Sequence, residues 1–489
     1  MIAKRLFALA PLQIAQAVVG FGAIAAFTRL MSPDEFGRYA LALSISMFVH
    51  TLLFTWAEAA AYRFFSAAKA ERRLRDHFAT LLVLAALLGG AALMLTAVLL
   101  FLLDVRADIA AISVFAACAA IFRFITRMTR ETERAALAIG RYAMAETAYL
   151  AIGFAAGVAL LTTLHLGAAA PFAGLMVAGL VVFMIDAPRV LARAKGGAPS
   201  VARIGAYAGY GAPLALAIAL DLGVQTAARF LIAREAGPAA LGAYAAAFGL
   251  ARPLDLIFML AGTALTPLML TAYERDGETG AKDAARGALI TMLSLALPAC
   301  VGLCLTAAPL AQVLIGHGLS TEAARALPWL AVAGLMSGLN LYYWSEAFQL
   351  VRRTALRAAI MLAPGAAQLV LTLVLAPRFG AAGAAMSSAC ASVFAMILLS
   401  VTGRRFLALP VPVHAMARIA AACAAMAAIV AMIPVYDPLL TLTLKVAAGA
   451  AVYAGAACLL DIGGVRIIAT RIWPSASSRL APAPFAEEL

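Results

Sequence analysis

Long runs of predominantly apolar residues follow one another along almost the whole chain. A helix needs about 20 such residues to cross the hydrocarbon core of a bilayer. Of the 489 residues, 65% are hydrophobic and 12% are charged, which departs strongly from the composition of soluble domains. The sequence therefore predicts an all-α polytopic membrane protein with about fourteen spans, near residues 6–29, 37–62, 78–103, 108–129, 142–163, 168–187, 206–232, 241–270, 287–315, 327–349, 355–376, 381–402, 414–434 and 439–461.

The basic residues between these spans indicate the orientation. Lys and Arg accumulate at the cytoplasmic ends of membrane helices. With the N-terminus inside, 28 of the 37 Lys and Arg residues fall on cytoplasmic ends and seven on outer ends. One missed span would reverse every later loop and destroy this bias. We therefore expect both termini to be cytoplasmic.

A short motif occurs twice. Residues 29–42, RLMSPDEFGRYALA, return at 234–247 as REAGPAALGAYAAA, with Arg, Pro, Gly and Tyr matched at one constant offset. Each copy follows the first long apolar segment of its half, which indicates an internal duplication of the kind that builds alternating-access transporters. The charge pattern places both copies on the outer side of the membrane, opposite the cytoplasm. We expect each to be a short, hinge-like turn shaped by its Pro and Gly, and not the substrate site.

The duplication predicts a division of the chain into lobes. Spans one to six would form an N-lobe over residues 1–205, and spans seven to twelve a C-lobe over residues 206–403. Six crossings return the chain to its starting side, so the lobes would be parallel repeats. Residues 404–465 would add spans 13 and 14, and residues 466–489 would be a disordered cytoplasmic tail.

The sequence around the first motif resembles a known family. After the first apolar helix, TRLMSPDEFGRYALALS at 28–44 is similar to the polysaccharide-biosynthesis flippases of the multidrug/oligosaccharidyl-lipid/polysaccharide exporter superfamily, where Glu-Phe-Gly-x-Tyr of this kind is typical. The resemblance implies a MATE-like fold in a bacterial inner membrane. It implies translocation of an undecaprenyl-pyrophosphate-linked oligosaccharide between leaflets for O-antigen, lipopolysaccharide or exopolysaccharide biosynthesis. Association with the polymerase of the same pathway is a further expectation.

Several other classes are excluded or disfavoured. The net charge of +13 is spread in short clusters between apolar runs, so no nucleic-acid partner is expected. The sequence lacks the GxxxxGK[ST] motif for ATP, its five histidines are dispersed, and the expected external loops are short. We therefore expect neither an enzyme nor a resident cofactor or metal. The predicted partners are the lipid-linked substrate, membrane lipids and a coupling ion, either a proton or sodium.

Charged residues inside spans are the candidates for a substrate site, because an ionisable group at membrane depth normally faces a bundle interior or a wet cavity. In span eight, Arg252 and Asp255 are one turn apart near the midplane. Arg252 either pairs with Asp255 or Asp221, or holds the pyrophosphate, since guanidinium groups match phosphate oxygens. The full set of candidate cavity residues is Arg252, Asp255, Asp221, Gln225, Arg229, Gln13, Gln16, Asn340 and Tyr343.

Some of these candidates have a simpler interpretation. Arg229 lies near the outer interface, where snorkelling explains an arginine. Tyr343 could pack between helices instead of lining a sugar passage. The candidates for ion coupling are Asp221, Asp255, Glu58 and Glu346. Three carboxylates near cytoplasmic ends, Glu58, Glu146 and Glu346, could instead be solvated or paired with Arg63, Arg141 or Arg352.

Three rival functions remain open. A drug or cation exporter of the same architecture would favour an anionic cavity, whereas an arginine at the midplane favours an anionic substrate. A flippase for the peptidoglycan lipid precursor would share the fold, but we expect more arginines in its first two spans. A membrane polysaccharide polymerase or ligase would require a large external loop, and none is predicted.

Overall fold

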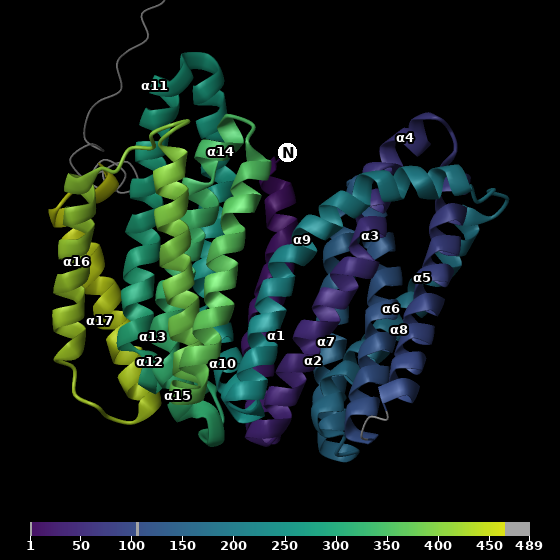
Figure 1. The fold of residues 1–489 in the computed structure, drawn as a ribbon, viewed down its shortest axis with the longest axis horizontal. Coiled ribbons are helices and arrows are strands. Elements are labelled where there is room, and N and C mark those ends of the chain that lie inside the picture. The colour runs from purple at the N-terminus through teal and green to yellow at the C-terminus, as the bar shows by residue number, and fades with distance from the viewer. Residues whose placement is uncertain (1, 104–106, 465–489) are drawn as a thin grey trace, which may run out of the picture. The chain divides into compact units, whose positions relative to one another are not determined.

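The computed structural model describes residues 2–103 and 107–464, with the side chains described from residue 12 onward. These residues are almost entirely helical, and no strand occurs among them, so the all-α prediction is confirmed. The α-helices are α1 (Ile2–Leu30), α2 (Pro33–Leu53), α3 (Thr55–Arg63), α4 (Phe65–Ala70), α5 (Leu74–Leu103), α6 (Ala107–Ala135), α7 (Ile139–Thr163), α8 (Ala170–Ala194), α9 (Val201–Glu235), α10 (Pro238–Ala251), α11 (Pro253–Leu305), α12 (Ala307–Leu314), α13 (His317–Leu339), α14 (Glu346–Leu350), α15 (Thr354–Gly403), α16 (Val413–Ala431) and α17 (Pro438–Leu459) (Figure 1). Short 3₁₀ turns lie at Gly167–Ala169 and Ile462–Gly464, and a π-helical turn lies at Asn340–Trp344.

The described residues contain eleven stretches that are long and apolar enough to cross a membrane. Two of them, Pro238–Leu305 and Thr354–Gly403, are each long enough for two crossings. Each is bent at a glycine, Gly277 with φ +65° and Gly380 with φ +56°. Glycine adopts positive φ without a steric penalty, so it is the residue that lets the chain reverse at these points. Together with α13 and its continuation to Leu350, these segments confirm the predicted set of about fourteen membrane helices.

The second predicted span is not one continuous helix. It is divided at Phe54 into α2 and α3, and Phe54 itself is almost fully buried, with 1% of its surface exposed. No Pro or Gly lies at this break, which is why the sequence pattern did not reveal it. Aromatic packing holds the break in place, because the Phe54 ring stacks on Phe124 of α6 with centroids 4.5 Å apart.

The chain forms two compact units. The first unit comprises Met1–Gly249, Leu314–Ala323 and Gln368–Ala384. Within it α7 and α6 both pack on α8, α1 packs on α7, and α9 packs along α2 and α3. Small residues permit these close approaches: a Cβ added at Gly174 of α8 would lie 2.4 Å from the backbone nitrogen of Gly157 in α7.

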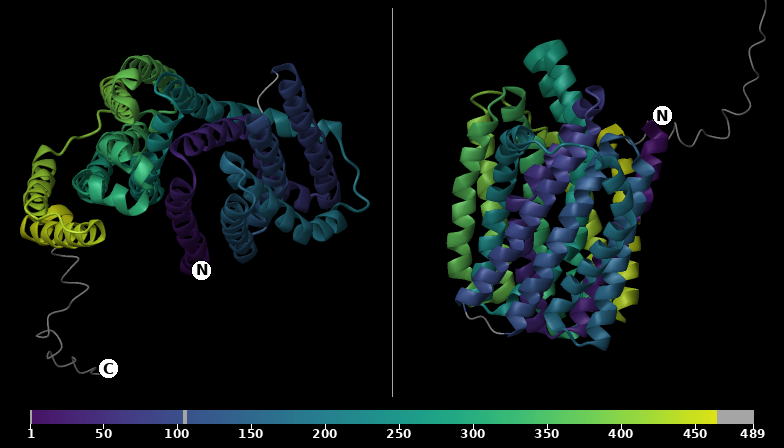
Figure 2. Two further views of the ribbon diagram at one scale, coloured as in Figure 1. Left: turned by 90° about the horizontal axis from the view of Figure 1, so that it is seen from below. Right: turned by 90° about the vertical axis from the view of Figure 1, so that its right-hand side faces the viewer.

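The second unit comprises Leu250–Val313, Ala324–Ala367 and Ala385–Leu489. Its core is built around α11, where Leu254, Phe258 and Met292 are completely buried. Helices α16 and α17 pack against each other as a pair, which the left view of Figure 2 shows in yellow, and α16 packs on α11. The division into lobes at residues 205 and 403 stays a prediction, and the predicted disordered tail at 466–489 lies outside the described residues.

Candidate functional site

The two copies of the duplicated motif contact each other within the first unit. A Cβ added at Gly37 of α2 would lie 1.8 Å from the carbonyl oxygen of Pro238, and one added at Gly242 of α10 would lie 3.0 Å from that of Pro33. Each glycine therefore faces the proline at the start of the other copy's helix. The repeat thus builds a helix crossing in which glycine is needed because backbone meets backbone.

Local sequence fixes the start of both helices at this crossing. Ser32 caps α2, accepting a hydrogen bond from Glu35 N at 3.3 Å while Glu35 Oε2 accepts one from Ser32 N at 2.9 Å, and Pro33 occupies the first turn. This is a capping box, which fixes where the helix begins. The second copy uses Gly237, at φ +89°, directly before Pro238. Both copies are turns with Pro at the helix start, as expected; their direct contact was not predicted.

A buried group of charges lies where α2, α3 and α6 meet in the first unit. Glu58, only 4% exposed, shares a hydrogen bond of 2.9 Å with His50 Nε2, and its other oxygen lies 3.6 Å from Arg127 Nε. The break at Phe54 brings His50 and Glu58 together from consecutive helices. The suggested pairing of Glu58 with Arg63 is therefore wrong.

A second buried pair adjoins this group. Arg123 of α6 makes two hydrogen bonds to the Glu146 carboxylate of α7, at 3.1 and 2.9 Å, and lies 4.4 Å over the ring of Tyr149. The partner of Glu146 is thus Arg123 and not Arg141. The two arginines and two glutamates of this site carry equal and opposite formal charges, and Glu131 of α6 also interacts electrostatically with Glu58 and Arg127.

The second unit also holds a buried carboxylate, Glu346, which is 2% exposed. Its Oε1 accepts hydrogen bonds from Thr266 Oγ1 of α11 and from Gln349 Nε2, both at 3.2 Å. Glu346 follows the π-helical turn at Asn340–Trp344, and such turns occur frequently at functional sites. Its hydrogen-bond partners are neutral, so the suggested pairing with Arg352 is wrong.

Asn340 and Tyr343 have structural contacts in this turn. Asn340 Nδ2 donates to the Ser392 carbonyl oxygen at 2.9 Å, and the Tyr343 hydroxyl donates to the carbonyl oxygen of Pro410. Tyr343 is completely buried. In this conformation both side chains tie the π-helical turn to neighbouring segments of the second unit.

Arg252 lies at the junction of α10 and α11, about 21 Å along the helix from Pro238 if each residue rises about 1.5 Å. Leu254 and Phe258 of the same helix are buried, whereas Arg252 and Asp255 are exposed on its other face. Within the described part of the chain, no salt bridge of 4.0 Å or less joins Arg252 to Asp255. The guanidinium group and the carboxylate one turn away therefore interact through their charges without forming a close ion pair.

The remaining candidates lie on α9 and α1 of the first unit. Gln225 donates to Asp221 Oδ2 at 3.1 Å on the exposed side of α9. Arg229 does not snorkel: its Nη1 donates to Ser44 Oγ at 2.7 Å, and it lies 5.2 Å over the Phe248 ring. Gln13 and Gln16 are both exposed on α1.

The predicted span 108–129 leaves the charged residues that follow it in a cytoplasmic loop, whereas α6 continues through residues 130–135 and ends at Ala135. Arg130 is 3% exposed and forms ion pairs with Glu133 at 2.6 Å and with Asp186 of α8. The spacing of three or four residues between Arg123, Arg127, Arg130 and Arg134 was the signal that could have revealed this, since it repeats with the helical period.

Solved structures define the class of this fold. A lipid II flippase MurJ in an inward closed conformation matches with a TM-score of 0.72 at 12% identity, covering 92% of this chain and 98% of that one. An inward-facing multidrug resistance MATE family transporter of the MOP superfamily matches with a TM-score of 0.65 at 14% identity, covering 81% and 97%. A MOP superfamily transporter from Pyrococcus furiosus matches with a TM-score of 0.51 at 15% identity, covering 81% and 95%. The protein thus has the fold of multi-pass membrane transporters and flippases.

A family model narrows this class. The model described as polysaccharide biosynthesis protein matches residues 26–320, more than half of the chain. The chain belongs to this family. A search of curated proteins finds no match.

Proposed function

We propose that this protein is a flippase of the bacterial inner membrane that moves an undecaprenyl-pyrophosphate-linked oligosaccharide from the cytoplasmic to the periplasmic leaflet. Membership in the polysaccharide biosynthesis family is the observation that carries this proposal. The shared fold with flippases and transporters supports alternating access as the mechanism. The excess of basic residues on one side supports cytoplasmic termini.

Arg252 is the residue that we propose for binding the pyrophosphate. Its side chain is exposed on α11, and its guanidinium group is not paired with Asp255 within 4.0 Å. A guanidinium group can donate two parallel hydrogen bonds to phosphate oxygens, which a lysine cannot reproduce. An arginine at this depth is costly unless it meets an anion or water, so binding an anionic headgroup gives it a function.

The test uses the purified full-length protein in proteoliposomes loaded with a fluorescent undecaprenyl-pyrophosphate oligosaccharide. Appearance of the sugar in the opposite leaflet is followed by a membrane-impermeant lectin. Arg252→Ala should reduce flipping to background, and Arg252→Lys should restore it only in part. Lys445→Ala, which removes a cation from α17, is the matched control and should flip normally. Normal flipping by correctly inserted Arg252→Ala would refute this role.

The same vesicles separate the rival functions. The similarity to a lipid II flippase makes the peptidoglycan precursor the second substrate to test. Faster flipping of that precursor than of the oligosaccharide would favour the rival. Export of a cationic dye instead of either lipid would favour a drug exporter.

We propose Glu58 as the ion-coupling residue of the first unit. Its carboxylate is buried and faces His50 from α2 and Arg127 from α6, with Arg123 and Glu131 of α6 in electrostatic range, so binding or release of one proton changes the charge of this buried cluster. Glu58→Gln should abolish the response of flipping to a pH gradient, whereas exposed Glu278→Gln should not change it. A response to a sodium gradient alone, or a normal pH response of Glu58→Gln, would contradict proton coupling at this residue. Glu346→Gln tests the corresponding carboxylate of the second unit.

A further inference from the structure

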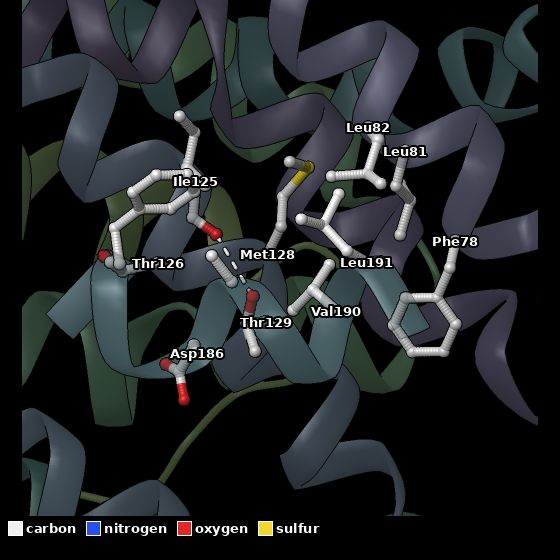
Figure 3. A pocket seen from close by; sticks show the side chains of 12 residues that line it. Phe78, Leu81, Leu82, Ile125, Thr126, Met128, Thr129, Asp186, Val190 and Leu191 are labelled. Atoms are coloured by element: carbon white, nitrogen blue, oxygen red, sulfur yellow. Dashed lines mark hydrogen bonds between the residues drawn. The ribbon is translucent and has the colours of Figure 1, made fainter. Parts of the chain in front are cut away.

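An apolar cavity of about 80 Å³ lies between α5, α6 and α8 in the first unit. Its walls include Phe78 and Leu82 of α5, Met128 of α6, and Leu191 of α8, whose side chains converge in Figure 3. The polar groups of its lining are already bonded elsewhere. Thr129 Oγ1 donates to the Ile125 carbonyl oxygen at 3.4 Å, and the Asp186 carboxylate points away from the apolar side chains toward its ion pair with Arg130.

The cavity adjoins an open depression along α5 and α8. Leu82 and Leu191 line both, and Val83, Lys195 and Pro199 are also among the residues that line the depression. Leu191 is 59% exposed and Val83 38% exposed, so the groove is accessible from the side of the helix pair. The cavity and depression together make one apolar groove that ends at a cation.

Further positive charge surrounds that end of the groove. The Arg193 guanidinium lies 5.6 Å over the ring of Phe78, a wall residue of the cavity. Arg189 is on the same helix, with its side chain 61% exposed. Asp186 is the acidic lining residue, and it is paired with both Arg130 and Arg189.

Asp76 of α5 also lies at this end of the groove, where its Oδ1 accepts a hydrogen bond from Ala198 N at 3.0 Å and its Oδ2 pairs with Arg203 at 3.2 Å. Both carboxylates near the groove thus have arginine partners, and Arg193 and Lys195 add positive charge at the rim of the apolar channel.

We propose that this groove, defined by Phe78, Leu82, Leu191 and Lys195, is a binding site for an anionic glycerophospholipid of the cytoplasmic leaflet. One acyl chain would lie between α5 and α8, and the phosphodiester would contact Lys195 and Arg193. Both helices are candidate membrane spans, so the occupant reaches the groove from the bilayer. The cavity volume of about 80 Å³ favours part of a flexible acyl chain over a ring, because an apolar cavity that accepts benzene measures about 150 Å³.

The positive charge at the rim of the groove favours a lipid with an anionic headgroup. Each Lys or Arg near a membrane surface strengthens binding of anionic lipid, and the rim carries two such residues at its mouth. A zwitterionic headgroup brings its own cation and would gain less from this rim. Neither Arg252 nor Glu58 lines the groove, so the proposed role of this lipid is that of a structural partner of α5 and α8 and not that of cargo.

Photo-crosslinking of the full-length protein tests this site. The probe is phosphatidylglycerol with a diazirine in one acyl chain, in vesicles of unlabelled phosphatidylcholine, with labelled peptides identified by mass spectrometry. Labelling should concentrate on residues 78–83 of α5 and 183–191 of α8. A phosphatidylcholine probe with the same diazirine should label these peptides about tenfold less.

Variants separate the rim from the channel. Arg193→Gln with Lys195→Gln should lower phosphatidylglycerol labelling about tenfold, whereas the matched pair Lys69→Gln with Arg73→Gln should leave it unchanged. Ala187→Phe, which fills the cavity, should move the label away from α8. Equal labelling by both probes, full labelling of the rim variant, or displacement of the probe by equimolar polyprenyl phosphate would each overturn the proposal.

Discussion

The crossing of the duplicated motif predicts an unequal response to alanine at its two glycines. A Cβ at Gly37 would lie 1.8 Å from the Pro238 carbonyl oxygen, whereas ordinary contact begins at 3.4 Å, so the two helices would have to separate by about 1.6 Å. At Gly242 the corresponding contact is 3.0 Å, and a shift of about 0.4 Å suffices. A carbonyl oxygen cannot rotate away as a side chain can, so Gly37→Ala must open the crossing.

Overpacking of this kind costs about 1–3 kcal/mol, and we place Gly37→Ala at the upper end. Alanine in a helix returns about 1 kcal/mol relative to glycine. The net destabilisation of the crossing is then about 2 kcal/mol, equivalent to roughly a 30-fold change in its opening equilibrium. Gly242→Ala should be close to neutral, because its smaller clash is offset by the same gain.

Hydrogen–deuterium exchange of the purified full-length protein measures this opening directly. Gly37→Ala should accelerate exchange in residues 33–42 and also in 238–247, because the two copies hold each other. Gly90→Ala is the control: nothing lies within 4 Å of its added Cβ in α5, so exchange at the crossing should not change. If Gly37→Ala exchanges like the wild type, or if only residues 33–42 respond, the two copies are not packed as described.

Two further predictions concern side chains that hold helices together. Arg130→Ala removes the partner of buried Glu133 and leaves buried Asp186 with the exposed Arg189 at 3.9 Å, so it should destabilise the protein by about 3–5 kcal/mol. Arg275→Ala breaks an ion pair in which both side chains are exposed, at 77% and 45%, and should have little effect on stability. Thermal unfolding in detergent measures the difference, and equal midpoints for the two variants would disprove it. Ser44→Ala removes the acceptor for Arg229 and should destabilise the contact between α2 and α9 by about 1.5–3 kcal/mol. Ser113→Ala, at a hydroxyl whose hydrogen bond is exposed, should have little effect. An unchanged unfolding midpoint for Ser44→Ala would favour the interpretation that Arg229 snorkels.

The helices were predictable from the sequence because the membrane demands long apolar runs with satisfied backbones. The reversal at Gly380 also lay close to a predicted junction of spans. The break at Phe54 was not predictable, since it depends on stacking against Phe124, a residue 70 positions away in the sequence. Local pattern carries no information about such a contact.

The buried charges were predictable only in part. Glu58 and Glu346 were recognised because a carboxylate in an apolar run is rare and conspicuous. Their partners were misassigned because sequence proximity suggested nearby arginines, whereas other helices supplied His50 and Thr266, and the same helical turn supplied Gln349. In the membrane a buried carboxylate needs hydrogen-bond donors, and these come from whichever helices the fold brings together.

The duplicated motif has positions that both copies share and is followed by positions at which the copies differ, and the two kinds of position have different roles. Positions shared by both copies, Gly37 with Gly242 and Pro33 with Pro238, form the crossing itself, and they are alike because each must meet the other's backbone. Eight residues after the end of the motif the copies differ. The second copy is followed by the exposed Asp255, whereas the first is followed by His50, which is bonded to Glu58. A duplicated pair of helices needs equal small residues to cross closely, whereas the proposed substrate binding at Arg252 and the proposed ion coupling at Glu58 assign different chemistry to the two copies. We therefore expect substitutions at the shared glycines to alter conformational opening, and those at His50 and Arg252 to alter coupling and substrate binding separately.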